Sequence, residues 1–235
     1  MNVGAGARTA TPSMPSTPSA PPPTVKPRLR GVSHLYACAV AAVLGVVTIA
    51  TAPAGTATVA AVIYAVGLVA MFGASALYHR PQWSEARAAR FLAVDHTAIF
   101  VMIAGTSTPI ALLAVGGTLG DVMLTLVWAI AGAGIVFEWL PVRRPRGYVT
   151  AVYLTLGWIG VIGLGGMWDT TGPEGVALVA GGGVLYTIGA IVHAAHRPDP
   201  WPLVFGFHEV FHAFVIAAAL AHWCAIQFLV LPLGS

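Results

Sequence analysis

Seven long apolar segments alternate with short polar connections along the chain. The segments cover about 34–52, 57–78, 94–115, 119–140, 149–168, 175–196 and 208–231. Each has roughly the 20 residues that one helical crossing of a membrane needs. Two of the connections, Pro53-Ala54-Gly55 and Gly116-Gly117, consist of residues that typically break helices. The pattern therefore predicts an all-α polytopic membrane protein whose fold is a bundle of seven transmembrane helices.

The residues before the first apolar segment differ in composition from the rest. Residues 1–30 contain seven prolines among Ser, Thr, Ala and Gly, and such a segment lacks the apolar side chains that form a core. It also lacks the apolar stretch of a cleaved signal peptide. We therefore expect a disordered, proline-rich cytoplasmic tail at 1–30 and a seven-helix membrane domain at 31–235.

The charged residues are few, and their positions predict the orientation of the bundle. Only 8% of the residues are charged, against about 25% in soluble domains. Every Lys and Arg lies in the tail or in a connection that follows an even-numbered segment: Arg8, Lys26, Arg28, Arg30, Arg80, Arg87, Arg90, Arg143, Arg144, Arg146 and Arg197. Because positively charged loops stay in the cytoplasm, we expect a cytoplasmic N-terminus and an outside C-terminus. This topology already explains the basic clusters, so they do not indicate nucleic-acid binding.

Glycines are dense in the fifth and sixth segments. Small residues let membrane helices approach closely, so we interpret these positions as helix-packing faces. They are Gly157, Gly160, Gly163, Gly165, Gly166, Gly181, Gly182, Gly183 and Gly189.

Polar side chains gather where three of the segments reach the predicted cytoplasmic side. Ser75 and His79 close the second segment, and Asp95 opens the third. His208 and His212 open the seventh segment, four residues apart and therefore on one helix face. An ionisable group inside a membrane is costly and is usually functional. The topology thus predicts that a Ser, an Asp and three or four His converge in one layer.

The composition of this layer matches the chemistry of a hydrolytic zinc site. Three neutral imidazoles hold Zn²⁺ tetrahedrally and leave one position for water, and zinc lowers the pKa of that water to about 7. Asp95 could accept a proton from the water, and Ser75 could orient the water or a substrate carbonyl. The alternative is that His208 and His212 are polar residues that cap a membrane helix near the headgroups.

Three motifs, in matching order, resemble the hemolysin III family. They are Ser75-x-x-x-His79, the stretch from Asp95-His96 to Pro109, and His208-Glu209-Val210-Phe211-His212. The resemblance covers about 30–231 and extends to the progestin and adiponectin receptors and, more distantly, to alkaline ceramidases. It implies zinc near the cytoplasmic face with His79, His208 and His212 as ligands, Asp95 in contact with the zinc-bound water, and Ser75 beside them. It also implies a multi-pass protein of the bacterial cell (plasma) membrane.

The family name and the relatives imply different activities. The name implies haemolysis, which is a cytolytic activity, whereas the receptors and ceramidases imply hydrolysis of a lipid amide. We expect a zinc-dependent hydrolase whose lipid substrate enters sideways from the bilayer. Two alternatives stay open. One is a non-enzymatic membrane homeostasis or receptor-like protein with structural zinc. The other is a pore-forming cytolysin, which the lack of a sustained polar stripe disfavours.

We expect the other polar residues to support the structure and not to bind metal or take part in catalysis. His208 to His212 matches the H-E-x-x-H pattern of zinc proteases, in which the Glu is a general base. Here the motif starts a membrane helix, so we expect Glu209 to interact favourably with the helix dipole instead. We expect His96 to play a supporting role or to be an interfacial residue. The remaining expected interfacial residues are His34, His193, His196, Glu138 and Trp139.

Overall fold

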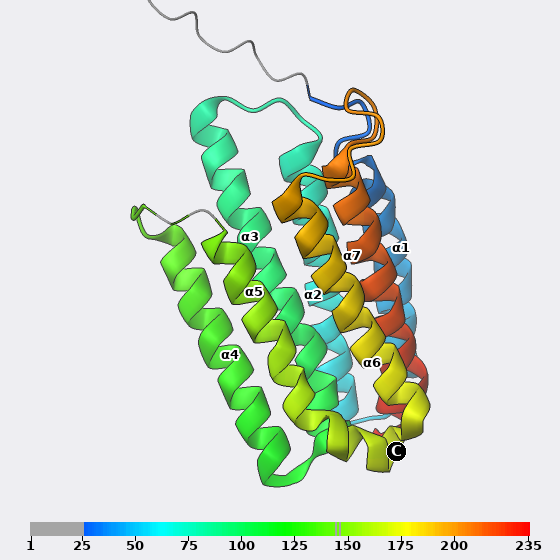
Figure 1. Ribbon diagram of the computed structural model, residues 1–235. Coiled ribbons are helices and arrows are strands. Elements are labelled where there is room, and N and C mark those ends of the chain that lie inside the picture. Colours follow the sequence, from blue (N-terminus) through cyan, green and yellow to red (C-terminus); the bar gives the residue numbers. More distant parts are fainter. Residues whose placement is uncertain (1–25, 144, 146) are drawn as a thin grey trace, which may run out of the picture.

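A computed structural model of the protein describes residues 26–143, 145 and 147–235, and it is a bundle of long helices (Figure 1). Residues 1–25 of the tail predicted at 1–30 lie outside the described residues, as do Arg144 and Arg146. The described part of the chain contains no β-strand, only one isolated bridge between Trp201 and Phe205.

The α-helices follow one another with short connections. They are α1 (Val32–Thr51), α2 (Thr56–His79), α3 (Glu85–Pro109), α4 (Gly117–Trp139), α5 (Tyr148–Trp158), α6 (Leu164–Ala195) and α7 (Phe207–Ala225). Three of them continue as another helix type. Helix α3 widens into a π-helix at Ile110–Val115, and α5 tightens into a 3₁₀-helix at Ile159–Gly163. Helix α7 continues as a π-helix at Ile226–Val230 and a 3₁₀ turn at Leu231–Gly234.

Six helical stretches of the described chain are long and apolar enough to cross a membrane. One of them, Tyr148–Ala195, has 48 residues and joins the two segments predicted at 149–168 and 175–196. The prediction of an all-α membrane protein is confirmed. The count of seven crossings and the cytoplasmic placement of the N-terminus stay predictions.

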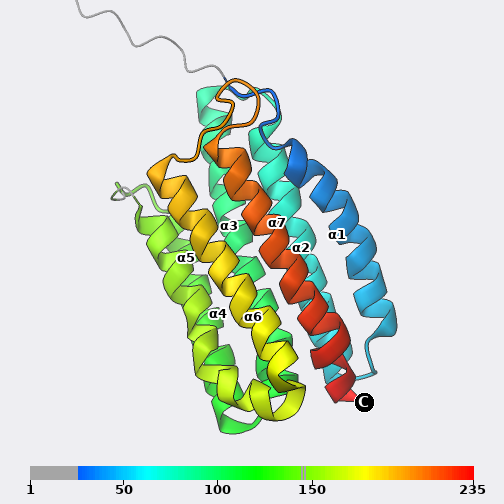
Figure 2. The same cartoon turned by 45° about the vertical axis from the view of Figure 1, so that its right-hand side comes forward.

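The long stretch Tyr148–Ala195 is broken at Gly172. This residue has φ 69° and ψ −174°, and Pro173 follows it. A positive φ is readily adopted only by glycine, and proline cannot donate the backbone hydrogen bond that would continue the helix. Helices α5 and α6 consequently lie side by side (Figures 1 and 2), and Trp158 Nε1 donates to Thr187 Oγ1 at 3.2 Å.

The described start of the chain and the C-terminus lie at opposite ends of the bundle (Figure 1). An odd number of membrane crossings requires such an arrangement. The α2–α3 and α6–α7 connections lie at the same end as the described start. We call this end the polar end, because the polar layer expected from the sequence lies there.

The main apolar core forms where α2 faces α3 and α7. Tyr64, Leu68 and Phe72 of α2 belong to one buried cluster with Met102 of α3 and Val215 of α7. Because buried side chains interdigitate closely, this packing fixes the last turn of α2 relative to the first turns of α7.

Residues 26–30 were expected in the disordered tail, but they are held against the bundle. The N–H of Arg28 donates to the carbonyl of Leu203 at 3.0 Å, and the N–H of Leu29 donates to that of Val204 at 3.0 Å. The partners belong to the α6–α7 connection, which is remote in sequence. Local composition carries no information about such a contact, and the division into a tail and a membrane domain stays a prediction.

Candidate metal centre

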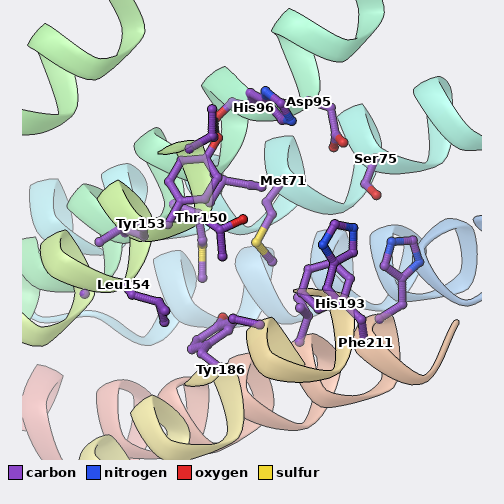
Figure 3. A pocket seen from close by; sticks show the side chains of 18 of the residues that line it. Met71, Ser75, Asp95, His96, Thr150, Tyr153, Leu154, Tyr186, His193 and Phe211 are labelled. Carbon is purple, nitrogen blue, oxygen red and sulfur yellow. Dashed lines mark hydrogen bonds between the residues drawn. The ribbon is translucent and has the colours of Figure 1, made fainter. Parts of the chain in front are cut away.

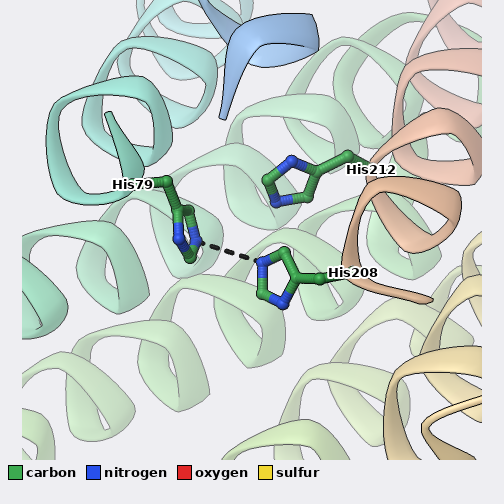
Figure 4. A group of neighbouring side chains, drawn as sticks. All are labelled: His79, His208 and His212. Carbon is green, nitrogen blue, oxygen red and sulfur yellow. Dashed lines mark hydrogen bonds between the residues drawn. The ribbon is translucent and has the colours of Figure 1, made fainter. Parts of the chain in front are cut away.

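Three histidines from two helices meet at the polar end (Figure 4). His79 is the last residue of α2, while His208 and His212 lie one turn apart at the start of α7. Nε2 of His79 and Nε2 of His208 are 3.2 Å apart. One ring nitrogen from each histidine lies within 4.8 Å of the others. His212 is 1% exposed and His79 is 9% exposed, so the cluster is largely removed from solvent.

The distances and the donor type fit a zinc ion. Zinc binds imidazole nitrogens at about 2.0–2.1 Å with tetrahedral angles, so two such nitrogens lie about 3.3 Å apart. The 3.2 Å separation of the His79 and His208 nitrogens is close to this value. No other group of three or more His, Cys, Asp or Glu in the described part of the chain has metal-binding geometry. The cluster can therefore hold a metal ion, and its nitrogen donors suit zinc.

The structure brings Asp95 and Ser75 to the same place. Asp95 of α3 is 8% exposed, and its Oδ2 lies 3.8 Å from Nε2 of His79. This distance exceeds a direct hydrogen bond and is one that a bridging water can span. Ser75 lies one turn before His79 on α2 and is buried. All five residues singled out from the sequence thus lie together.

His34 is a member of this group that the sequence interpretation missed. It was expected at the interface but is 3% exposed, and its Nδ1 lies 2.8 Å from the Oγ of Ser75. Its ring also stacks on that of His212, with centroids 3.6 Å apart and planes 13° apart. The position of His34 at the start of the first segment, on the predicted side of the polar layer, was the signal that could have revealed it.

Glu209 lies between the two histidines of α7 in sequence, but its carboxylate has other partners. Oε1 lies 2.6 Å from Nε of Arg30, and Oε2 accepts the N–H of Gly206 at 2.8 Å. The second contact caps the first turn of α7, which agrees with the expected role at the helix N-terminus. Because both oxygens are engaged, the carboxylate is not arranged as the general base of a zinc protease.

His96 is paired with Glu138 and not with Asp95, and this pair is partly buried. Its Nδ1 lies 3.0 Å from Oε1 of Glu138, and the hydroxyl of Tyr153 donates to its backbone carbonyl at 2.9 Å. Glu138 was expected to be an interfacial anchor, but it is only 7% exposed. Trp139 beside it is 54% exposed, and its interfacial position stays a prediction. The His96–Glu138 pair joins the middle of α3 to the end of α4.

A large cavity opens from the histidine cluster into the bundle (Figure 3). Its volume is about 1230 Å³, which exceeds the roughly 300–1,000 Å³ of pockets for drug-sized ligands. Asp95 and Ser75 lie on one side of it and His193 on the other. Its walls are mostly apolar and include Met71 and Tyr186. The cavity therefore offers a polar end beside the histidines and an apolar remainder.

Some of the glycines expected in packing faces line this cavity instead. A Cβ placed at Gly157, Gly160 or Gly183 would meet no atom within 4 Å, and all three line the cavity. The packing interpretation is wrong for them and right for Gly189, where a Cβ would lie 3.0 Å from that of Phe214. The missing side chains widen the space between α5 and α6.

The family described as haemolysin-III related matches residues 24–223. This range contains the histidine cluster, His34, Ser75, Asp95 and the pair Arg30–Glu209. The resemblance inferred from the three sequence motifs is therefore confirmed.

Individual relatives come from bacteria and animals. Hemolysin-3 of Bacillus cereus is 31% identical over 180 residues, which cover 77% of this chain and 79% of that protein. The Hemolysin-3 homolog of Bacillus subtilis is 36% identical over 135 residues, which cover 57% of this chain and 61% of that protein. Monocyte to macrophage differentiation factor of Homo sapiens is 27% identical over 168 residues, 70% of this chain and 67% of that protein. This chain belongs to the haemolysin-III related family.

Proposed function

We propose that the protein is a zinc-dependent hydrolase of membrane lipid amides, located in a bacterial cell membrane. One observation carries the proposal: three imidazoles and a buried carboxylate lie at the polar end of a large, mostly apolar cavity. A lipid amide has the matching form, with a polar amide next to a long apolar chain. In a bilayer, such a lipid would enter sideways and place its amide beside the histidines.

His79, His208 and His212 would hold the zinc. The ion supplies Lewis-acid chemistry, which polarises a carbonyl and makes water a nucleophile near neutral pH. His79 and His212 are buried, and His208 is partly exposed, so bulk water has limited access to the site. The imidazoles also bring no negative charge, so the ion keeps its full charge for polarising the substrate.

Asp95 is the group proposed to move the proton. Its Oδ2 lies within reach of a water molecule placed beside His79, and it accepts a proton as the water oxygen attacks the amide carbon. When the carbon–nitrogen bond breaks, the same proton is available for the leaving amine. General acid–base help of this kind contributes about 10²–10⁴-fold to a rate.

Ser75 is proposed to orient the water or the substrate carbonyl. Its hydroxyl lies in the last turn of α2, one turn before His79, and the hydrogen bond with His34 holds it in place. A hydroxyl that is already fixed can orient the water or the carbonyl without an entropy cost for ordering itself at each turnover.

A non-enzymatic role with structural zinc is the second candidate. The names of the similar proteins favour it, because they refer to haemolysis and to cell differentiation and not to an enzyme. In that case the zinc would link α2 and α7 structurally, and Asp95 would have no catalytic role.

The test uses the purified, zinc-loaded protein in lipid nanodiscs with a panel of N-acylated lipids. The proposal predicts release of fatty acid that stops when a chelator removes the metal. Failure to release fatty acid from any lipid of the panel would favour the structural role. A parallel dye-leakage assay with liposomes tests pore formation, which predicts leakage without hydrolysis.

A further inference from the structure

The short segment from Lys26 to Gly31 contacts both sides of the histidine cluster. On one side, a Cβ at Gly31 would lie 2.7 Å from the Cβ of His79, so the segment packs directly against the end of α2. On the other side, Arg30 reaches Glu209 in the first turn of α7. The segment therefore connects the helix that carries one candidate ligand with the helix that carries the other two.

The segment itself is anchored by hydrogen bonds to two connections. Lys26 Nζ donates to the carbonyl of Pro81 at 3.0 Å, in the α2–α3 connection. The N–H groups of Arg28 and Leu29 donate to the α6–α7 connection, as described above. The backbone that carries Arg30 is consequently held in place, so the guanidinium of Arg30 has a defined position relative to α2.

Glu209 transmits this position to the candidate ligands. It is 1% exposed, it follows His208 directly, and it lies three residues before His212. One oxygen bonds Arg30 and the other caps the helix at Gly206. The first turn of a helix lacks internal partners for its N–H groups and is easily frayed, and His208 lies in this turn. The two contacts fix both its rotation and its end.

We propose that Arg30 and Glu209 are positioning residues of the metal centre, which hold the first turn of α7 so that His208 and His212 face His79. The inference rests on the zinc-binding part of the proposed function. Metal ligands need placement within about 0.2 Å of the preferred distances, and a frayed turn does not provide it. Loss of residues that support metal ligands typically reduces metal affinity by about 10–100-fold.

A general stabilising role predicts a different result from a positioning role. Replacing a buried ion pair by apolar residues of similar size is often neutral for stability. The double variant Arg30→Met/Glu209→Met leaves no unpaired charge and so can keep the fold. Glu138→Gln is the matched control, because Glu138 forms a partly buried pair with His96 at the same end but belongs to α4, which carries no candidate ligand.

The experiment measures zinc affinity of the full-length protein by competition with a chelator, together with the visible spectrum of bound Co²⁺ and the thermal unfolding temperature. Arg30→Gln, Glu209→Gln and the double variant should each bind zinc about 10–100-fold more weakly, with a changed cobalt spectrum. Glu138→Gln should bind zinc like the wild type. Arg30→Lys keeps the positive charge that compensates Glu209, so we expect it to fold even if the double variant is unstable. It should also bind zinc more weakly than the wild type, because lysine does not reproduce the geometry of the guanidinium.

Three results would overturn the inference. A folded double variant that binds zinc as tightly as the wild type would show that the pair only stabilises the fold. Unchanged affinity and spectrum in Arg30→Lys, when the double variant does not fold, would show the same. A folded wild type that binds no zinc would overturn this inference and the proposed function together, whereas the first two results leave the proposed function intact.

Discussion

The ring of His34 lies flat against the ring of His212, with centroids 3.6 Å apart and planes 13° apart. The same ring bonds Ser75 through Nδ1 at 2.8 Å. His34 thus joins the serine of α2 to a candidate ligand of α7 without belonging to the group with metal-binding geometry. This relationship separates residues that would hold the metal from residues that support them.

His34→Ala should destabilise the protein but keep its zinc. Ser75 would lose its partner, and a buried polar group without a partner costs about 1–3 kcal/mol. The measurement is thermal unfolding in detergent, with metal analysis of the same sample. Ser75→Ala is the companion variant, because it removes the same hydrogen bond but keeps the stacked ring. Complete loss of zinc in His34→Ala would instead make His34 a ligand.

Asp95→Asn should slow hydrolysis strongly and leave the metal content unchanged. The amide cannot accept a proton, so the rate of fatty acid release should fall by about 10²–10⁴-fold. Asp95 lies 3.8 Å from His79 and is not needed to hold the ion. Normal hydrolysis by the variant would remove Asp95 from the mechanism.

Gly160→Leu should narrow the cavity without disturbing the fold. A Cβ there meets no atom within 4 Å, and Gly160 lines the cavity, so the longer leucine side chain has open space to enter. Release of fatty acid from long-chain lipid amides should fall by about tenfold or more, which corresponds to roughly 1.4 kcal/mol. The unfolding temperature should stay close to that of the wild type.

Two other glycines provide the controls for Gly160→Leu. Gly165 also has open space around its missing side chain but does not line the cavity, so Gly165→Leu should leave the rate unchanged. Gly189 packs against Phe214, so Gly189→Leu should destabilise the protein by about 1–3 kcal/mol through overpacking. Equal rates for Gly160→Leu and Gly165→Leu would mean that the substrate does not occupy the cavity beside α5.

Gly31→Ala should weaken metal binding, because the new methyl group would push against His79. Gly31 has φ 73°, and its Cβ would lie 2.7 Å from that of His79. Gly55→Ala is the matched control, since Gly55 has φ 91° but open space around it. Both variants carry backbone strain of about 1–2 kcal/mol, and Gly31→Ala adds the clash with His79, so its unfolding temperature should be the lower of the two. Only Gly31→Ala should lower the affinity for zinc, and equal affinities would show that this contact does not position His79.

The sequence predicts the membrane bundle and the polar layer because both depend on local properties. Hydropathy marks the helices, and the spacing of His208 and His212 places them on one face. The burial of His34, by contrast, depends on how α1 rotates against α2 and α7. The surroundings of Gly157 and Gly160 also depend on helix rotation, since a glycine can face either a neighbouring helix or a cavity.

The contact between Arg30 and Glu209 was not predictable for a further reason. Its residues are 179 positions apart, and one of them lies in a segment whose composition is typical of disorder. Only the folded position of the α6–α7 connection brings them together. The count of seven crossings stays a prediction. The positive charges argue for seven, whereas two of the predicted segments lie in the one stretch Tyr148–Ala195, which is broken at Gly172.

Metal analysis of the purified protein tests the central claim most directly. Wild type should be compared with His79→Ala, His208→Ala and His212→Ala, and with His193→Ala as a control. His193 lines the same cavity, with its ring centroid 5.1 Å from that of His208, but is not in the cluster. We predict one zinc ion per chain in the wild type and in His193→Ala, and loss of zinc in each of the other three. A folded wild type without metal, or zinc retained in all three variants, would contradict the account.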